Sequence, residues 1–222
     1  MMDATPVWLS LKTTVTATAI TFVLGILAAR WRLGARGHWV GFVDALLLLP
    51  LALPPTVIGL ALLVFFGRNS PVGQMLSDFG VDVIFSWQAT VITAVVASFP
   101  LMYQSSYAAF QQIDGELLDV GRLYGMGEWQ LLWHIMLALA WPGILVGTIL
   151  SFVRALGEFG ATLMLAGSIP GRTQTIPLAI FFHVESGEFY QAGLLSLVTL
   201  MISVIVLFVV RLPQSAKVPL RR

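Results

Sequence analysis

Cysteine is absent from the 222 residues, which excludes disulfide bonds and thiolate metal sites. Charged residues are also scarce, at 10% of the chain against about 25% in ordinary soluble domains. The net charge of +1 is spread along the chain and forms no basic run of the kind that binds nucleic acid. The N-terminus has no basic segment before its first apolar stretch, so the sequence predicts no cleaved signal peptide. A chain with so few charges cannot cover a water-exposed surface.

Apolar residues, in contrast, make up 58% of the chain, and the mean hydropathy is +0.89. A helix needs about 20 apolar residues to cross the hydrocarbon core of a membrane. Five segments approach this length, so the sequence predicts an all-α, polytopic transmembrane bundle of about five spans. These segments are Val7–Ala29, Val40–Phe66, Trp87–Tyr103, Leu137–Ala166 and Ala192–Val210. The second and the fourth are long enough to tilt or bend.

Basic residues between the spans predict which side of the membrane each loop occupies, because cytoplasmic loops are enriched in Lys and Arg. Eight basic residues fall on one predicted side: Arg30, Arg32, Arg36, Arg122, Arg211, Lys217, Arg221 and Arg222. Three fall on the other: Lys12, Arg68 and Arg172. The N-terminus is therefore expected outside and the C-terminus in the cytoplasm. The expected organisation is one membrane domain, residues 1–215, and a short basic cytoplasmic tail, residues 216–222. Five spans are few to enclose a path, so a homodimer is expected, with the path on its two-fold axis.

The loop between the third and fourth spans, residues 104–137, is too long for a tight connection between helices. Its apolar residues recur at helical spacing on both sides of Gly125 and Gly127. This pattern predicts two short amphipathic helices with a glycine bend between them. Such a unit suits the groove of a soluble partner, and it equally suits a position flat on the lipid headgroups.

The stretch "DVGRLYGMGEWQLLWHI" resembles the cytoplasmic coupling loop of ABC-importer permeases, whose pattern is E-A-A-x3-G-x9-I-x-L-P. The acid position is Asp119, the second small position is Gly121, and Gly125, Ile135 and Leu137 keep the spacing. Ala138 replaces the proline of the pattern. The stretches "LLPLALPPTVIGLALLVFFGRNSPVGQ" and "LGEFGATLMLAGSIPGRTQTIPLAI" resemble the molybdate and tungstate branch of these permeases. The sulfate-type branch shares the "RALGEFG" portion.

The resemblance implies the fold of type I importer permeases and a permease for molybdate or tungstate in a bacterial or archaeal cytoplasmic membrane. It further implies two cytoplasmic ATPase subunits, which would bind ATP and Mg, and an external molybdate-binding protein. Glu116 and Asp119 are implied contacts to the ATPase, and Gly125 the residue that permits the bend. Ile135 and Leu137 would pack the second short helix against the base of the fourth span. The chain would bind no cofactor and would not itself be an enzyme.

Polar and helix-breaking residues within the spans mark a candidate path or gate. Arg154 and Glu158 are spaced i,i+4, which favours a mutually neutralising pair, while a position near the path is the alternative. Gly157 and Ala161 form a small-xxx-small pair that favours close helix packing, a gate, or both. Prolines in the second span predict a kink. The complete candidate set is Pro54, Pro55, Thr56, Arg154, Gly157, Glu158, Gly160 and Thr162.

The stretch 168–189 is external in the predicted topology, and its apolar run Ile176–Val184 is too short to span a membrane. Arg172, Glu185 and Glu188 are candidate contacts to the binding protein, and a solvated loop is the plainer interpretation. No P-loop, H-E-x-x-H or G-x-S-x-G motif occurs, so uphill transport would need a partner or an ion gradient. Three alternatives stay open: a sulfate or thiosulfate permease, a gradient-driven carrier, and a membrane-embedded enzyme that uses Glu158 and His183.

Overall fold

The structure is a computed structural model and describes residues 4–214, in which every regular element is helical. This confirms the predicted all-α class. The elements, in chain order, are α1 (Thr5–Gly34), α2 (His38–Ala52), α3 (Pro55–Phe66), α4 (Pro71–Asp78), α5 (Trp87–Gln111), α6 (Gly115–Leu123), α7 (Glu128–Leu131), the π-helical turn η1 (Leu132–Met136), α8 (Leu137–Leu156), α9 (Gly160–Ala166), α10 (Ile176–Glu185) and α11 (Phe189–Gln214).

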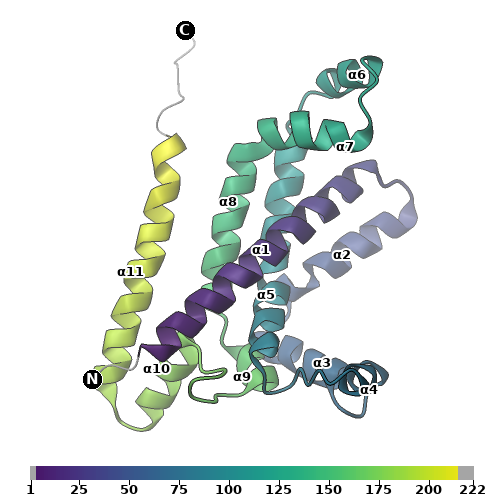
Figure 1. Ribbon diagram of the computed structural model, residues 1–222. Helices are drawn as coiled ribbons and strands as arrows, with labels where there is room; N and C mark the ends of the chain where they lie inside the picture. The colour runs from purple at the N-terminus through teal and green to yellow at the C-terminus, as the bar shows by residue number, and fades with distance from the viewer. Residues whose placement is uncertain (1–3, 215–222) are drawn as a thin grey trace.

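Helix α5 lies at the centre of the bundle and packs most extensively against α1 and α8 (Figure 1). Small residues allow the close approach. A Cβ atom placed on Gly25 of α1 would lie 2.6 Å from Met102 Cγ, and one on Gly147 of α8 would lie 2.7 Å from Ser105 Cβ. Helices in lipid associate through such close contacts because burial of apolar surface supplies little drive there.

Hydroxyl groups fill much of the bundle interior. The buried polar residues of the described chain are Glu158 and fourteen serines and threonines: Ser10, Thr13, Thr14, Thr18, Thr21, Ser86, Thr90, Thr93, Ser98, Ser106, Ser151, Thr162, Thr173 and Thr175. Several of them join different helices. The Oγ1 atoms of Thr13 and Thr90 lie 3.1 Å apart, and Ser151 Oγ donates to the Ser98 carbonyl at 3.2 Å. Interhelical bonds of this kind contribute about 0.6 kcal/mol each on average.

The number of spans differs from the prediction. Among the described residues, three helical stretches are long and apolar enough to cross a membrane: Thr5–Gly34, Glu128–Leu156 and Phe189–Phe208. A fourth span results if α2 and α3, which meet at 115°, are taken together. The predicted third span is α5, which has 25 residues but falls outside this set. Its buried face carries threonine and serine, which α1 and α8 shield from lipid, so it is less apolar than a helix that faces lipid.

Two predicted spans are not continuous helices: both were expected to tilt or bend, and the structure has a break in each. The segment Val40–Phe66 breaks between Ala52 and Pro55, because Pro54 cannot donate the backbone hydrogen bond that would continue α2. The segment Leu137–Ala166 breaks after Leu156, where α8 ends and α9 begins only at Gly160.

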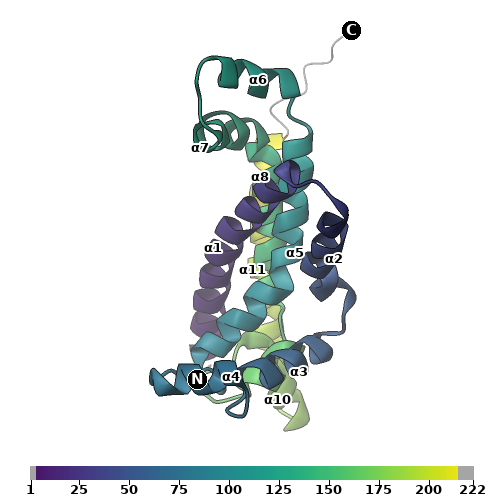
Figure 2. The same ribbon diagram turned by 90° about the vertical axis from the view of Figure 1, so that its right-hand side faces the viewer.

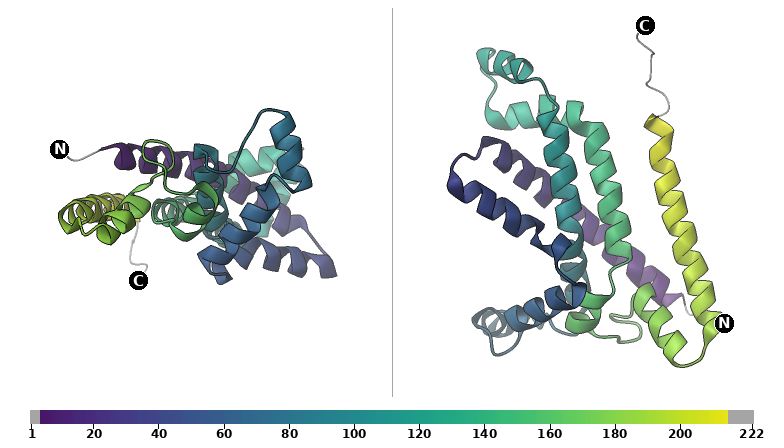
Figure 3. Two further views of the ribbon diagram at one scale, coloured as in Figure 1. Left: turned by 90° about the horizontal axis from the view of Figure 1, so that it is seen from below. Right: turned by 180° about the vertical axis from the view of Figure 1, so that it is seen from behind.

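The two ends of the bundle carry different elements (Figures 1 and 3). At one end, here called the hairpin end, α6 and α7 project beyond the other helices (Figure 2). At the other end, the α10 end, lie α3, α4, α9 and α10. Arg30, Arg36 and Arg122 line one cavity at the hairpin end, so these predicted cytoplasmic residues share an end of the molecule. The assignment of that end to the cytoplasm stays a prediction. The predicted tail, 216–222, lies outside the described residues.

Candidate functional site

Helices α6 and α7 with the bend between them, residues 115–131, are here called the hairpin. Its first helix, α6, has a side-chain cap at its N-terminus. Asp114 precedes α6, and its side chain accepts a hydrogen bond from the Glu116 amide at 3.0 Å. This satisfies one of the amide groups that a helix leaves without an internal partner at its N-terminus. Glu116 itself is exposed in the first turn of α6, where a carboxylate complements the helix dipole. It has no ion-pair partner among residues 4–214.

The glycine bend ends α6 as the sequence predicts. Gly125 has φ +79°, a left-handed conformation that glycine adopts without steric penalty. Its amide donates to the Arg122 carbonyl at 2.9 Å, and the Met126 amide donates to the Gly121 carbonyl at 3.1 Å. These two bonds form a Schellman motif, which satisfies carbonyls at the end of the helix. The Gly127 amide then donates to Gln130 Oε1 at 2.9 Å, which caps the start of α7.

Gly121 holds the two arms of the hairpin together. It is the buried residue of α6, and a Cβ atom placed on it would lie 2.5 Å from Leu131 Cδ2 and 3.1 Å from Ile135 Cδ1. The second small position of the coupling-loop pattern therefore has a steric reason here, because a larger residue would push α6 away from α7. Ile135 contacts α6, while Leu137 packs against the core cluster at the base of α8.

The predicted second short helix is not a separate element. Helix α7 continues through η1 into α8, so that residues 128–156 form one helical stretch. The wider π-helical turn at Leu132–Met136 keeps the backbone hydrogen-bonded between α7 and α8. Leu131, Leu132 and Met136 are almost completely buried, so this stretch is anchored in the core on its way from the hairpin to the membrane helix.

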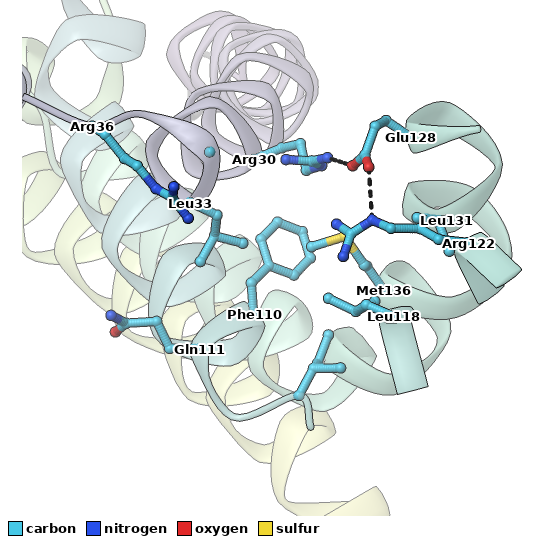
Figure 4. A pocket seen from close by; sticks show the side chains of 12 residues that line it. Arg30, Leu33, Arg36, Phe110, Gln111, Leu118, Arg122, Glu128, Leu131 and Met136 are labelled. Atoms are coloured by element: carbon cyan, nitrogen blue, oxygen red, sulfur yellow. Dashed lines mark hydrogen bonds and ion pairs between the residues drawn. The ribbon is translucent and has the colours of Figure 1, made fainter. Parts of the chain in front are cut away.

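A chain of charged residues joins the hairpin to the end of α1 (Figure 4). Glu128 accepts hydrogen bonds from Arg30 of α1 and, at 3.0 Å, from Nε of Arg122 in α6. Arg122 also pairs with Asp119 at 2.7 Å. The hydrogen bonds to Glu128 and then to Asp119 raise the pKa of the Arg122 guanidinium above its ordinary value. Asp119 is thus engaged within α6 while its side chain stays 72% exposed, which leaves oxygen lone pairs for a partner.

A second group of predicted residues lies at the two helix breaks. Pro54 and Pro55 form the turn between α2 and α3, and the Pro54 carbonyl accepts from the amides of Val57 and Ile58. Pro54, Pro55 and Thr56 are exposed in the single chain. The predicted kink is therefore present, and it is a break with a 115° turn rather than a gentle bend.

The break between α8 and α9 is organised by Glu158. Its Oε2 pairs with Arg154 Nη1 at 2.7 Å, while its Oε1 accepts from the Ala161 amide at 2.9 Å and caps α9. The carboxylate is 2% exposed and the Arg154 side chain 29% exposed. The predicted pairing of these two charges is present in the structure. The Glu158 carboxylate thus pairs with a residue in the last turn of α8 and caps the first turn of α9.

The proposed Gly157–Ala161 packing pair does not exist on one helix. Gly157 is exposed after the last turn of α8, and Ala161 belongs to α9. The i,i+4 spacing assumed an unbroken helix, whereas α8 ends at Leu156 and the Glu158 side chain caps the separate helix α9 through the Ala161 amide. Gly160 makes the close contact instead, since a Cβ atom on it would lie 2.9 Å from Pro55 Cβ. Thr162 is buried and its hydroxyl lies 2.9 Å from that of Thr93, which ties α9 to α5.

Helices α3 and α9 meet through Gly59, which sequence reasoning did not single out. A Cβ atom on Gly59 would lie 2.7 Å from Met164 Cβ and 2.9 Å from Ala161 Cα. Gly59→Val is expected to destabilise the protein by about 1–3 kcal/mol, because an Ala161 backbone atom must move to accommodate it. Thermal unfolding of the purified protein measures the effect. Gly41→Val is the matched control, since Gly41 is helical with open space around its Cβ position. Equal melting temperatures for the two variants would contradict the tight α3–α9 contact.

The candidate binding-protein contacts lie on the segment that contains α10. Arg172 is exposed and lines a cavity of about 620 Å³ together with Arg68 and Asp82. Glu185 is exposed at the end of α10, and Glu188 accepts from His183 at 2.6 Å. Ile176–Glu185 is a helix of ten residues, consistent with the predicted short apolar helix. His183 and Glu158, the pair of the enzyme alternative, are engaged with different partners.

No group of three or more His, Asp or Glu residues suited to a metal occurs within residues 4–214. The hydroxyl array of α1 and α5 was missed by sequence reasoning, although its signal was present. Ser10, Thr13, Thr14, Thr18 and Thr21 recur at helical spacing on one face of an otherwise apolar span. The partnership of Arg30 and Glu128 had no sequence signal, because 98 residues separate them.

Comparison with known proteins finds relatives among membrane components of transport systems. The family described as binding-protein-dependent transport system inner membrane component matches residues 21–214. The molybdenum transport system permease protein ModB of Escherichia coli K12 is 39% identical over 93% of this chain and 94% of its own. ModB of Azotobacter vinelandii is 35% identical over 93% and 92%.

Solved structures share the fold at low sequence identity. A chain of the MetNI methionine ABC transporter in an inward-facing conformation has a TM-score of 0.72 at 16% identity and covers 96% of this chain and 95% of that one. A chain of a bacterial ABC transporter that imports alginate has a TM-score of 0.70 at 19% identity, over 91% and 78%. The expected fold of importer permeases is thereby confirmed.

Proposed function

Because the chain belongs to the family of binding-protein-dependent transport system inner membrane components, we propose that it is the permease subunit of an ATP-driven importer for molybdate or tungstate. The observation that supports molybdate as the cargo is the sequence identity of 39% to a molybdenum permease, over more than nine-tenths of both chains. The proposal places this multi-pass chain in a bacterial or archaeal inner membrane. It includes two copies of the chain, two ATPase subunits and an external binding protein.

The hairpin is the proposed dock for the ATPase. It projects beyond the bundle, it is stiffened by the Schellman motif at Gly125, and it is joined to α1 through Glu128 and Arg30. Since α7 continues into α8, a movement of the hairpin is transmitted directly to a membrane helix. Closure of the ATPase dimer on ATP would pull the two hairpins and switch the path between inward-open and outward-open. Glu116 and Asp119 would meet the ATPase from the exposed face of α6.

The cargo path is proposed to lie between two copies of the chain. Three or four apolar spans do not enclose a path by themselves, whereas a second copy related by a two-fold axis would complete it. The breaks at Pro54 and at Gly157–Phe159 are the proposed gate, because irregular backbone at membrane depth requires a protein or water-lined environment. The path should bind the anion weakly, since tight binding would trap it. Hydrolysis of ATP, with its Mg, belongs to the partner subunit.

Uptake of labelled molybdate tests the cargo and the energy source together. The chain is supplied with its ATPase and binding protein to cells that lack high-affinity molybdate uptake. We expect uptake that excess tungstate abolishes and excess sulfate leaves unchanged, and that an ATPase with an inactivated P-loop does not support. Inhibition by sulfate would assign the chain to sulfate or thiosulfate transport. Uptake without an active ATPase would indicate a gradient-driven carrier.

A further inference from the structure

A large cavity lies between the end of α1 and the hairpin, outside the proposed gate. Its volume is about 700 Å³, within the range of about 300–1,000 Å³ that is typical of pockets for organic ligands. Three arginines from three segments line it: Arg30 from α1, Arg36 from the α1–α2 connection and Arg122 from α6 (Figure 4). Glu128 is the acidic residue among the lining side chains. The lining side chains carry two positive charges in excess, and Asp119, which pairs with Arg122 from outside the lining, leaves an excess of one.

The guanidinium groups keep unused hydrogen-bond donors. Arg36 is exposed and has no ion-pair partner among residues 4–214. Arg122 uses Nε for Glu128 and Nη1 for Asp119, and Arg30 uses Nη2 for Glu128. A guanidinium offers five N–H donors, so each of the three can still donate to a further anion. Planar guanidinium groups are well matched to the oxygen atoms of a phosphate.

Apart from Gln111, the other side chains of the cavity wall are apolar. They include, from α1, α5, α6, α7 and η1, Leu33, Phe110, Leu118, Leu131 and Met136. A small, fully hydrated anion gains nothing from such a wall, because it would have to give up water against apolar side chains. An amphiphile with an anionic head and apolar chains satisfies both the arginines and the wall.

The cavity also lies at the level where lipid headgroups are expected. Trp31, next to Arg30 in α1, and Trp39, in the first turn of α2, are 46% and 79% exposed. Exposed tryptophans at the ends of membrane helices settle at the headgroup layer. Basic pockets between membrane helices at this depth bind anionic lipid headgroups.

We propose that this cavity binds the phosphodiester headgroup of an anionic phospholipid, with Arg36 as the first contact and Arg30 and Arg122 as further donors. The bound headgroup contacts Arg30 and Arg122, the two residues that donate to Glu128. The lipid therefore also stabilises the junction between α1 and the hairpin. The proposal does not depend on which anion the protein transports.

Lipid retention by the purified permease–ATPase complex tests the proposal. The complex is titrated with phosphatidylglycerol or phosphatidylcholine, and native mass spectrometry counts the bound lipids. We expect preferential retention of phosphatidylglycerol, and a reduction of at least threefold in Arg36→Gln. Arg36 holds no internal ion pair, so this variant should fold normally, which size-exclusion chromatography verifies. Arg68→Gln is the matched control, because Arg68 is exposed at the α10 end and lines a different cavity. It should retain phosphatidylglycerol as the parent does.

Free anions are the competing occupants. Inorganic phosphate and glycerophosphoglycerol, which is the headgroup without acyl chains, are added at the concentration of the lipid. Neither should displace phosphatidylglycerol. Full displacement by either would show a site for free anions and overturn the lipid assignment. Equal retention by the parent and Arg36→Gln would overturn the site itself, while molybdate uptake by the parent tests the proposed function separately.

Discussion

Tryptophan in place of Gly125 is expected to abolish co-purification of the ATPase and to lower molybdate uptake at least tenfold. Gly125 has φ +79°, where a residue with a Cβ atom is disfavoured by about 1–2 kcal/mol. No atom beyond the two neighbouring residues lies within 4 Å of its Cβ position, so the added side chain enters open space around the bend. The substitution thus alters the surface offered to the ATPase and the angle of the hairpin. Affinity purification of the complex and uptake in cells measure the two effects.

A matched glycine separates this effect from general instability. Gly80 has φ +73° and open space around its Cβ position, but it follows α4 at the α10 end. Gly80→Trp carries the same backbone strain and should retain the ATPase. Gly125→Asn should retain more function than Gly125→Trp, because asparagine tolerates the left-handed conformation. Normal ATPase association and uptake in Gly125→Trp would contradict the docking role of the hairpin.

Replacement of Glu158 by alanine is expected to be the most destabilising change in the bundle. It removes the cap of α9 and leaves Arg154, 29% exposed, without its partner. Loss of one member of a buried ion pair costs about 3–5 kcal/mol, and the partial exposure of Arg154 favours the lower figure. At about 2–4 °C per kcal/mol for a chain of this size, the melting temperature should fall by about 6–12 °C. Differential scanning fluorimetry of the purified protein measures the shift.

Two further variants decide what the pair does. Glu158→Gln can still accept from the Ala161 amide, so it should lie between the parent and Glu158→Ala in stability. The double variant Arg154→Leu, Glu158→Leu removes both charges and leaves neither unpaired. If the pair is structural, the double variant is more stable than Glu158→Ala and still transports. A folded double variant without transport would place the Arg154–Glu158 pair near the path.

Local patterns predicted α6 and the glycine bend well, because the determinants of both are local. Gly125 requires its own left-handed φ, and the capping and Schellman bonds join residues within five positions of one another. The spacing between Asp119 and Gly125 was therefore nearly sufficient to predict the end of α6 and the bend. The packing role of Gly121 was also consistent with the small residue that the coupling-loop pattern expects there.

The break between α8 and α9 and the charge network were harder to predict, because a continuous helix fits the same local spacing and because the network joins segments far apart in the sequence. Arg154 and Glu158 have the spacing of a continuous helix, yet the Glu158 side chain binds the Ala161 amide and starts a new helix. The composition of α5 obscures its place in the core, since its threonine hydroxyls bond to α1 and α9, and its Ser98 carbonyl accepts from Ser151 of α8. Arg30 and Glu128 meet only because α1 ends beside the hairpin.

The π turn η1 fixes the direction in which the hairpin leaves the membrane helix. In an α-helix each residue advances about 1.5 Å and turns about 100° around the axis. Between Glu128 and Glu158 the chain is helical almost throughout, so the number of residues there sets the azimuth of the hairpin relative to the far break. One residue more or fewer would swing Glu128 to another side of the axis and away from Arg30. The number of residues in this stretch is therefore constrained, because it sets the rotation of the hairpin about the helix axis. This holds whichever apolar side chains occupy the stretch.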